Sequence, residues 1–359
     1  MQDLCEGMAL RGHTIQVATP FLSGGVARAE VKNGVKIVRL PSIRLMSRIN
    51  YIPSLIRTLR EFRPDLIHLH GYGCMLMNDQ VAIAFPNTPK VLTGHGGEIL
   101  TPYPGYSKPI LQIYGMLFGS WELKSMQRIV ALTNFEREYL LRMGVPEEHV
   151  SVISPGLKLL GREISSGEFR RDWNLVGKHM VLLLGRIHQR KGQSLLLKSM
   201  PQIVSAFPDS VAVFVGSEND YAAQLRRFAR LTGVEENILF TGHLGDNGKL
   251  QALAACDVYV SASSWESFGS SVVEAMLFGK PVVAADVGGM SELIEDGVSG
   301  LLFATRSQAK LAKQVCRLLA SATLRRKLGE AGRERAMTHF TIDRMLDAYE
   351  SLYRNLVLK

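Results

Sequence analysis

The sequence has few cysteines and no long apolar run, and both absences limit the class of protein. The four cysteines among 359 residues are widely spaced and form no Cys-x-x-Cys pair: Cys5, Cys74, Cys256 and Cys316. This spacing favours reduced, structural thiols over disulfide bonds or a zinc site. No apolar stretch reaches the length of a membrane-spanning helix, and the N-terminal residues are too acidic for a signal peptide. We therefore expect a cytoplasmic protein.

RNA-binding aromatic motifs and DNA recognition-helix patterns are also absent, so nucleic acid is not an expected partner. The net charge is nevertheless +9, and nine basic residues against two acidic ones lie between Arg28 and Arg63. Because apolar residues interleave with these cations, the segment could rest on an anionic membrane surface or hold an anionic acceptor. A location at the inner face of the membrane would follow from the first possibility. A solvated basic face is the simpler alternative.

What the sequence does contain is a regular alternation of β-branched apolar runs with stretches of helical periodicity. This alternation predicts an α/β protein with parallel sheets covered on both faces. The length suits two domains, and the boundary is expected at Gly156, the end of the sequence ISPG. We expect a domain over residues 1–156, a second over 157–340, and a final helix over 341–359 whose apolar spacing permits return to the first domain. Residues 157–178 are expected to form a polar linker.

The most informative stretch is Asp257–Phe303, which reads DVYVSASSWESFGSSVVEAMLFGKPVVAADVGGMSELIEDGVSGLLF. A helix is expected to begin after Gly269, where the glycine lets a ligand approach the free N–H groups near Ser270 and Ser271. Such a helix start favours a phosphate. The carboxylates of Glu266 and Glu274 flank this position and suit the hydroxyls of a ribose or a sugar. In the simpler interpretation, both acids only stabilise the helix N-terminus.

Other polar residues follow predicted strands, at the edge where open α/β sheets bind ligands. Arg186 and Lys191 lie in the turn GRIHQRKG and suit a diphosphate, although a basic surface turn is the alternative. Gly216 ends the next strand and could admit a nucleotide base. His95 and Gly96 follow the predicted strand Lys90–Thr93, where a structural histidine is the alternative. His68 and His70 alternate in another strand and are expected to be packing or cleft-edge residues.

The stretch ESFGSSVVE, in which seven residues separate two glutamates, continues as AMLFGKPVVAADVGGMSELIEDGVSGLLF and resembles the signature of family-4 retaining glycosyltransferases. The resemblance extends with varying strength over nearly the whole chain. It implies the type B glycosyltransferase fold, with two Rossmann-like domains whose parallel sheets face each other across a cleft. It also implies sugar transfer from a nucleotide-diphospho-sugar to a glycan, lipid-linked or other hydroxyl acceptor, without a metal or other cofactor.

The resemblance further implies a role for each candidate residue. Donor diphosphate binding is implied for Arg186 and Lys191, together with Gly269, Ser270 and Ser271. Ribose binding is implied for Glu274, and Gly216 would lie beside the base. Glu266 would hold donor-sugar hydroxyls near the reacting carbon, and His95 would position the sugar and the acceptor, so these two are the candidate catalytic residues. The family commonly has an aspartate shortly after the ISPG glycine, whereas Leu157 and Lys158 stand here and receive no role.

The chain departs from the family at its start, because LCEGMALRGHTIQVAT matches only the end of the first helix and the second strand. Roughly 25 residues, with the first strand and its paired-glycine loop, are therefore expected to be missing. Gly24 and Gly25 follow the second strand and are no substitute. Since the first strand is central, unpaired edges are expected in the middle of the first domain.

This departure supports a second hypothesis, a non-catalytic or degenerate sugar-nucleotide-binding paralogue. Phosphorolysis or epimerisation on the same fold is a third, because fold does not determine function. Turnover of a donor would separate the first hypothesis from the second, and the products would separate the third.

Overall fold

The computed structural model describes residues 1–359 except residues 22–27, 45–49, 73–74, 96–119, 159–163 and 359. Of the residues considered above, Gly24, Gly25, Arg48, Cys74 and Gly96 therefore lie outside the described residues. The chain divides into two compact units, unit 1 with Met1–Gly156 and Ile342–Lys359, and unit 2 with Leu157–Thr341. Cys5, Cys256 and Cys316 are free thiols. Every helix among the described residues is too short or too polar to span a bilayer.

Unit 2 is built on a six-stranded parallel sheet with the order β12-β11-β10-β13-β14-β15. The sequential strands run outward from β10 in one direction and then from β13 in the other. This order places a topological switch point between β10 and β13, where doubly wound sheets bind their ligands. The bounds are β10 (His179–Leu184), β11 (Ser210–Val215), β12 (Ile238–Gly242), β13 (Val258–Ser261), β14 (Val282–Ala285) and β15 (Leu301–Phe303).

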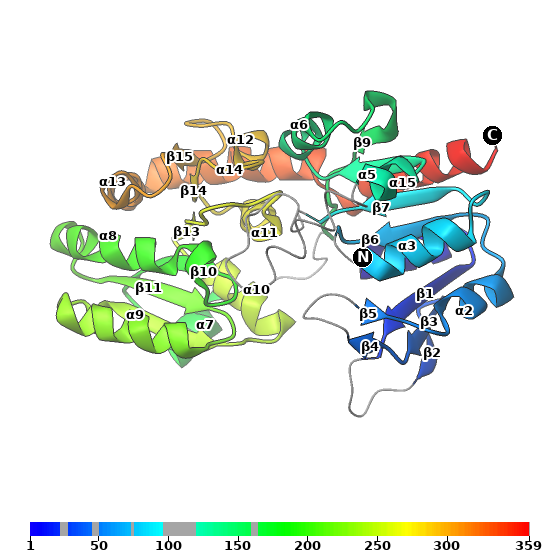
Figure 1. Cartoon of the computed structure of the whole chain (residues 1–359). Helices are drawn as coiled ribbons and strands as arrows, with labels where there is room; N and C mark the ends of the chain where they lie inside the picture. The colour runs from blue at the N-terminus through cyan, green and yellow to red at the C-terminus, as the bar shows by residue number, and fades with distance from the viewer. Residues whose placement is uncertain (22–27, 45–49, 73–74, 96–119, 159–163, 359) are drawn as a thin grey trace. The chain divides into compact units, whose positions relative to one another are not determined.

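Helices cover both faces of the unit 2 sheet (Figure 1). One face buries Val181, Leu183 and Val260 against α8 (Gln193–Ala206), α9 (Asp220–Leu231) and α13 (Gln308–Leu319). The strands also contact α10 (Asp246–Ala255), α11 (Ser270–Leu277) and α14 (Ala322–His339). The short elements are η4 (Gln189–Lys191), η5 (Glu235–Asn237) and α12 (Met290–Leu293). Burial on both faces explains the continuous apolar runs of these strands.

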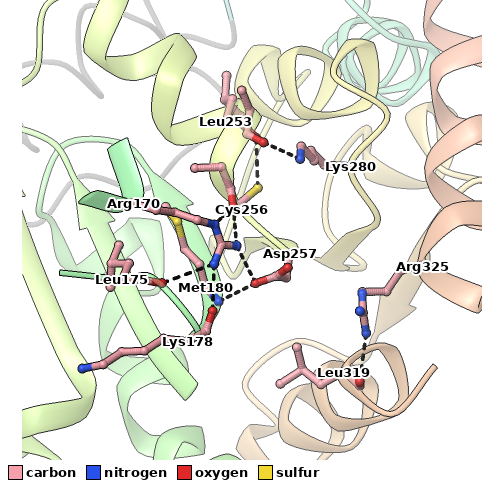
Figure 2. Close-up of polar contacts among 12 residues, drawn as sticks. Arg170, Leu175, Lys178, Met180, Leu253, Cys256, Asp257, Lys280, Leu319 and Arg325 are labelled. Carbon is pink, nitrogen blue, oxygen red and sulfur yellow. Dashed lines mark hydrogen bonds and ion pairs between the residues drawn. The ribbon is translucent and has the colours of Figure 1, made fainter. Parts of the chain in front are cut away.

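The prediction of a polar linker over residues 157–178 is wrong in part, because this segment contains helix α7 (Ser166–Asp172). The helix buries Phe169 and carries Arg170, whose guanidinium is surrounded by oxygen acceptors (Figure 2). These acceptors are the carbonyl oxygens of Leu175, Lys178 and Ala255 and the carboxylate of Asp257. The positive charge of Arg170, which suggests a solvated linker in the sequence, therefore makes hydrogen bonds within unit 2.

Unit 1 contains two separate sheets besides a short hairpin. The first has the order β1-β3-β2 and the second, which is parallel, the order β6-β7-β8-β9. The antiparallel pairing of β2 with β3 and the β4–β5 hairpin were not predicted from the sequence. The bounds are β1 (Ile15–Pro20), β2 (Ala29–Lys32), β3 (Val35–Leu40), β4 (Ile43–Arg44), β5 (Asn50–Tyr51), β6 (Ile67–His70), β7 (Lys90–Thr93), β8 (Arg128–Ala131) and β9 (Val150–Val152).

Strands β1 and β6 each have one edge that pairs with no other strand among the described residues. Both nevertheless contribute to one hydrophobic cluster, which contains Ala18 of β1, Leu40 of β3 and Ile67 of β6. The two sheets thus share a core although no ladder joins them. The described part of unit 1 therefore has the unpaired edges that the sequence predicts in the middle of this domain.

Helices α1 (Gln2–Leu10) and α15 (Ile342–Val357) pack together in unit 1. Leu4, Met8, Leu346 and Tyr349 form one cluster with Val91 of β7. Arg11, at the end of α1, also donates hydrogen bonds of 2.7 Å to Asp347 and Glu350 of α15. The other helices of this unit are α2 (Leu55–Phe62), α3 (Met75–Ala84), α5 (Ser120–Lys124), α6 (Asn134–Arg142) and η3 (Glu147–His149).

Candidate active site

The carboxyl ends of β10, β11, β13 and β14 lie at one edge of the unit 2 sheet, because these strands are parallel. The loop after β10 contains Arg186 and leads through η4 to Lys191. Gly216 follows β11, and the loop after β13 contains Glu266. The sequence-predicted residues of unit 2 are therefore gathered at the switch point between β10 and β13, except Gly216 on the neighbouring strand and Glu274 within α11.

Lys191 and Glu266 form an ion pair at this edge. The Nζ atom of Lys191 lies 2.8 Å from Oε2 of Glu266, although the residues are 75 positions apart in the sequence. Their side chains are 34% and 20% exposed, so a ligand can reach both. The hydroxyl of Ser263 donates a 3.3 Å hydrogen bond to the same carboxylate oxygen. Lys191, the candidate for diphosphate binding, and Glu266, the candidate for sugar binding, thus share one small site.

Gln193 shapes the loop that carries Arg186. This side chain is fully buried, and its Nε2 donates to the carbonyl oxygen of Arg186 at 3.0 Å. Its Oε1 accepts from the backbone N–H of His188 at 3.4 Å. The carbonyl of Arg190 accepts from the N–H of Ser264, which joins this loop to the one after β13. Gln193 was not predicted from the sequence, because an amide side chain at a helix start carries no signal of its own.

Two glycines allow backbone segments at this edge of the sheet to approach each other closely. A Cβ on Gly216 would lie 2.0 Å from the carbonyl oxygen of Gly185, so no side chain fits between these strand ends. Gly288 has φ +57°, and its Cβ would lie 1.9 Å from the carbonyl oxygen of Glu266. The N–H of Gly289 donates to that same oxygen at 3.2 Å. The glycine pair after β14 therefore fixes the backbone that presents the Glu266 carboxylate.

Helix α11 begins at Ser270, and Gly269 precedes it in a left-handed conformation with no side-chain cap. Ser270 is exposed, so the first turn of α11 is open to solvent. Val272 and Val273, in the same turn, are fully buried. The start of α11 is thereby packed into unit 2, and its N–H groups keep a fixed direction.

Glu274 of α11 also has a cationic partner. The Nζ atom of Lys249, in the first turns of α10, lies 2.7 Å from Oε1 of Glu274. The two side chains are 33% and 23% exposed. Lys249 was not predicted from the sequence, although a lysine near a helix N-terminus is unusual because it opposes the macrodipole. Both candidate glutamates of unit 2 are therefore held by lysines.

In unit 1, His95 lies just after β7 and contacts His70 at the end of β6. His70 Nδ1 and His95 Nε2 are 2.8 Å apart. His95 has a left-handed backbone with φ +52°, which is uncommon for a residue other than glycine. Burial, and then the neighbouring His95, lowers the pKa of His70 to about 3. His70, expected to be a packing or cleft-edge residue, is thus the direct partner of the candidate catalytic histidine.

Comparisons with family models identify the family of this chain. Residues 1–159 match the family model described as Glycosyltransferase Family 4, and residues 165–335 match the one described as Glycosyl transferases group 1. The chain belongs to family 4 of the glycosyltransferases. This glycosyltransferase has the expected type B fold with two Rossmann-like domains.

Three proteins illustrate the relationship. A phosphatidyl-myo-inositol mannosyltransferase of Mycobacterium leprae is 28% identical over 92% of this chain and 86% of its own length. The solved sucrose-phosphate synthase of Thermosynechococcus elongatus superposes with a TM-score of 0.81 at 25% identity, over 99% of this chain and 92% of that chain. Anabaena HepE, solved with UDP-glucose, gives a TM-score of 0.79 at 22% identity, over 99% and 94%. The last likeness bears on the fold alone.

Proposed function

We propose that this glycosyltransferase is a retaining hexosyltransferase that uses a nucleotide-diphospho-sugar and transfers the sugar to a glycan, lipid-linked or other hydroxyl acceptor. Unit 2 binds the donor, and unit 1 contributes His95. The observation that carries the proposal is the meeting of Lys191 with Glu266 at the switch point of the unit 2 sheet, beside the start of α11. A cation that can bind the diphosphate therefore lies next to a carboxylate that can bind hydroxyls. The cation suits the leaving group and the carboxylate suits the sugar, and these are the two ends of the bond that breaks.

Stabilisation of the leaving diphosphate is the main task of the site. When the bond between the anomeric carbon and the phosphate oxygen breaks, negative charge grows on the diphosphate. That negative charge is stabilised by the cations of Arg186 and Lys191 and by the N–H groups near Ser270 and Ser271. The proposed mechanism uses no metal. Glu266 holds hydroxyls of the donor sugar near the reacting carbon. Glu274 holds the ribose, and Gly216 leaves room for the base.

The family and the residues at the switch point support a nucleotide-sugar donor and leave several acceptor classes open. The mycobacterial relative is named for mannosyl transfer to phosphatidyl-myo-inositol. From the family and from the pairing of Lys191 with Glu266, we infer a nucleotide-diphospho-sugar donor for this chain. The product should keep the anomeric configuration of the donor, which the coupling constant of the anomeric proton in an NMR spectrum reports.

The proposal is tested by removing the cations singly. With a panel of uridine, guanosine and adenosine diphospho-sugars, Arg186→Ala and Lys191→Ala should each lower kcat/KM about a hundred- to a thousandfold, through both donor affinity and rate. Arg190→Ala is the matched control, because it removes the same charge from the same turn. Its kcat/KM should stay within about threefold of the unmodified protein. Unchanged kinetics in Lys191→Ala would refute the diphosphate assignment.

The interrupted sheet of unit 1 favours a second candidate, a sugar-nucleotide-binding protein without transfer activity. The proposed donor residues all belong to unit 2, whereas β1 and β6 of unit 1 have no strand ladder between them among the described residues. Calorimetric titration with UDP, GDP and ADP, run beside the transfer assay, separates the two candidates. Binding of one nucleotide without turnover of any donor would favour the second.

We also propose that the basic segment of unit 1 binds an anionic membrane surface. Arg28, Lys32 and Lys36 are exposed, and the same segment carries the apolar side chains of Val31 and Ile43, which are 74% and 53% exposed. Cations beside exposed apolar groups suit a headgroup surface. Phosphatidylglycerol vesicles should sediment the protein, whereas phosphatidylcholine vesicles should not. The variant Lys32→Glu/Lys36→Glu should lose this binding, and Lys310→Glu/Lys313→Glu of unit 2 should keep it.

A further inference from the structure

His70 and His95 meet at the carboxyl ends of neighbouring parallel strands. In the ladder of β6 with β7, His70 lies opposite Thr93, two residues before His95. The imidazole rings are stacked, with centroids 5.1 Å apart and an interplanar angle of 20°. The 2.8 Å separation of His70 Nδ1 from His95 Nε2 is that of a hydrogen bond. The contact therefore joins the candidate catalytic ring directly to a side chain of the sheet.

A partly buried hydrogen-bonded chain holds the ring of His68, which lies beside His70. The rings of His68 and His70 are 4.0 Å apart. His68 Nδ1 lies 2.6 Å from the hydroxyl of Tyr353, and its Nε2 lies 2.8 Å from Oγ1 of Thr93. The hydroxyl of Tyr349 lies 3.2 Å from the same Thr93 oxygen. Both nitrogens of His68 are engaged, so its ring is fixed and gives His70 a rigid neighbour.

A neutral imidazole carries its proton on one nitrogen only, and the hydrogen bond to that ring decides which one. Of the two facing nitrogens, one donates and the other accepts. The contact couples the two tautomers: a proton on His70 Nδ1 requires the proton of a neutral His95 to lie on Nδ1, and a bare His70 Nδ1 requires it to lie on Nε2. The tautomer of His70 therefore decides whether Nδ1 of His95 donates to a ligand or accepts from it. The left-handed backbone of His95 adds to this constraint, because such a conformation persists only where its surroundings hold it.

We propose that His70 is a positioning residue that holds the His95 ring in one tautomer and one orientation through the Nδ1–Nε2 hydrogen bond. The proposal rests on the proposed function, in which His95 contacts the sugar or the acceptor. His70 itself touches neither. Its effect on transfer runs entirely through His95.

Enzyme kinetics test this dependence. His70→Phe should lower kcat about thirty- to a hundredfold, with the KM for the donor nearly unchanged, because a misplaced catalytic group slows the reaction step. His70→Asn should bring kcat back to within about fivefold of that of the unmodified protein, since the asparagine amide places a polar atom near the position of Nδ1. The double variant His70→Phe/His95→Asn should be no slower than His95→Asn alone. Multiplying losses in the double variant would overturn the proposal.

Two further measurements separate positioning from damage to the fold and from failure of the proposed function. Lys90→Met removes the hydrogen bonds of a buried lysine to the carbonyls of Phe85 and Thr88, at the opposite end of β7, and leaves the His70–His95 contact, so it should lower the melting temperature but not kcat. If Lys90→Met slows transfer as much as His70→Phe, positioning by His70 is wrong. Ring ¹⁵N shifts in labelled protein report the His95 tautomer without any turnover. One tautomer in the unmodified protein and a mixture in His70→Phe is expected, and the same tautomer in both proteins would overturn the proposal even if no donor is turned over.

Discussion

Glu266→Gln should lower sugar transfer about a thousandfold while a nucleoside diphosphate binds more tightly than it does to the unmodified protein. The two effects differ in sign because the Glu266 carboxylate has two partners. It pairs with Lys191, and in the proposed reaction it holds hydroxyls of the donor sugar. Glu266 is paired with Lys191 at 2.8 Å, so part of the lysine charge is already neutralised. The amide of glutamine weakens that pairing and leaves Lys191 available to phosphate. A partly exposed ion pair of this kind corresponds to about a two- to fivefold gain in affinity.

Two variants make this result specific. Glu274→Gln should weaken nucleotide binding, because Glu274 is the proposed acceptor for ribose hydroxyls. Glu235→Gln removes a negative charge from the same unit at an exposed pair with Arg230, and it should change neither transfer nor binding. Calorimetric titration measures the affinities, and release of nucleoside diphosphate measures transfer. Transfer at the normal rate in Glu266→Gln would mean that Glu266 is not a catalytic residue. Weaker nucleotide binding in this variant would mean that the ion pair with Glu266 does not limit phosphate binding by Lys191.

The positions of the site residues could be predicted from sequence because strand ends are local features. The run Met180–Leu184 ends in GRIHQRKG, and Val258–Ala262 leads to Glu266, so both loops had to lie at the carboxyl edge of one parallel sheet. Hydrophobic periodicity places the elements, and parallel pairing then gathers their ends. No contact between the loops was needed for that step.

The partners of those residues could not be predicted in the same way. Lys191 with Glu266, Lys249 with Glu274, and His70 with His95 are pairs between different elements. Which side chains meet depends on strand register and on the height of each helix above the sheet, and neither leaves a local pattern. His70 illustrates this, since alternation in a strand describes the face of a residue but not its neighbour on the next strand.

Helix α7 was missed for a related reason. Residues 157–178 are rich in charge, and charge without apolar periodicity is typical of a linker. Arg170 reverses that interpretation, because its guanidinium lies among carbonyl oxygens, one of which, that of Ala255, ends α10. In that last turn the carbonyl of Ala254 accepts from Lys280 Nζ at 2.6 Å, and the carbonyl of Leu253 accepts from the thiol of Cys256 (Figure 2). Side chains from three segments thus satisfy carbonyls that the helix itself leaves unpaired.

Arg170→Met should lower the free energy of unfolding of unit 2 by about 3 kcal/mol. The guanidinium makes hydrogen bonds of 3.1 Å and 2.6 Å to the carbonyl of Ala255 and of 2.9 Å to Asp257 Oδ2. That carboxylate oxygen also accepts from the backbone N–H of Met180 at 2.7 Å, at the start of the central strand pair. Methionine keeps the aliphatic volume but leaves these oxygens, which are partly buried, without their donor. The arginine and the aspartate are 21% and 25% exposed, so solvent offsets part of the loss.

The neighbouring Arg171 provides the matched control, because it belongs to the same helix and is exposed. Arg171→Met should change the unfolding free energy by at most about 0.5 kcal/mol. Because the chain has two units, urea unfolding should be followed by the fluorescence of Trp173 and Trp265, with Trp121 of unit 1 replaced by phenylalanine. The anchored carbonyls lie at the end of the sheet opposite Lys191 and Glu266, so nucleotide affinity at a temperature where the variant is folded should be unchanged. Equal stability of the two methionine variants would mean that α7 is held by Phe169 alone.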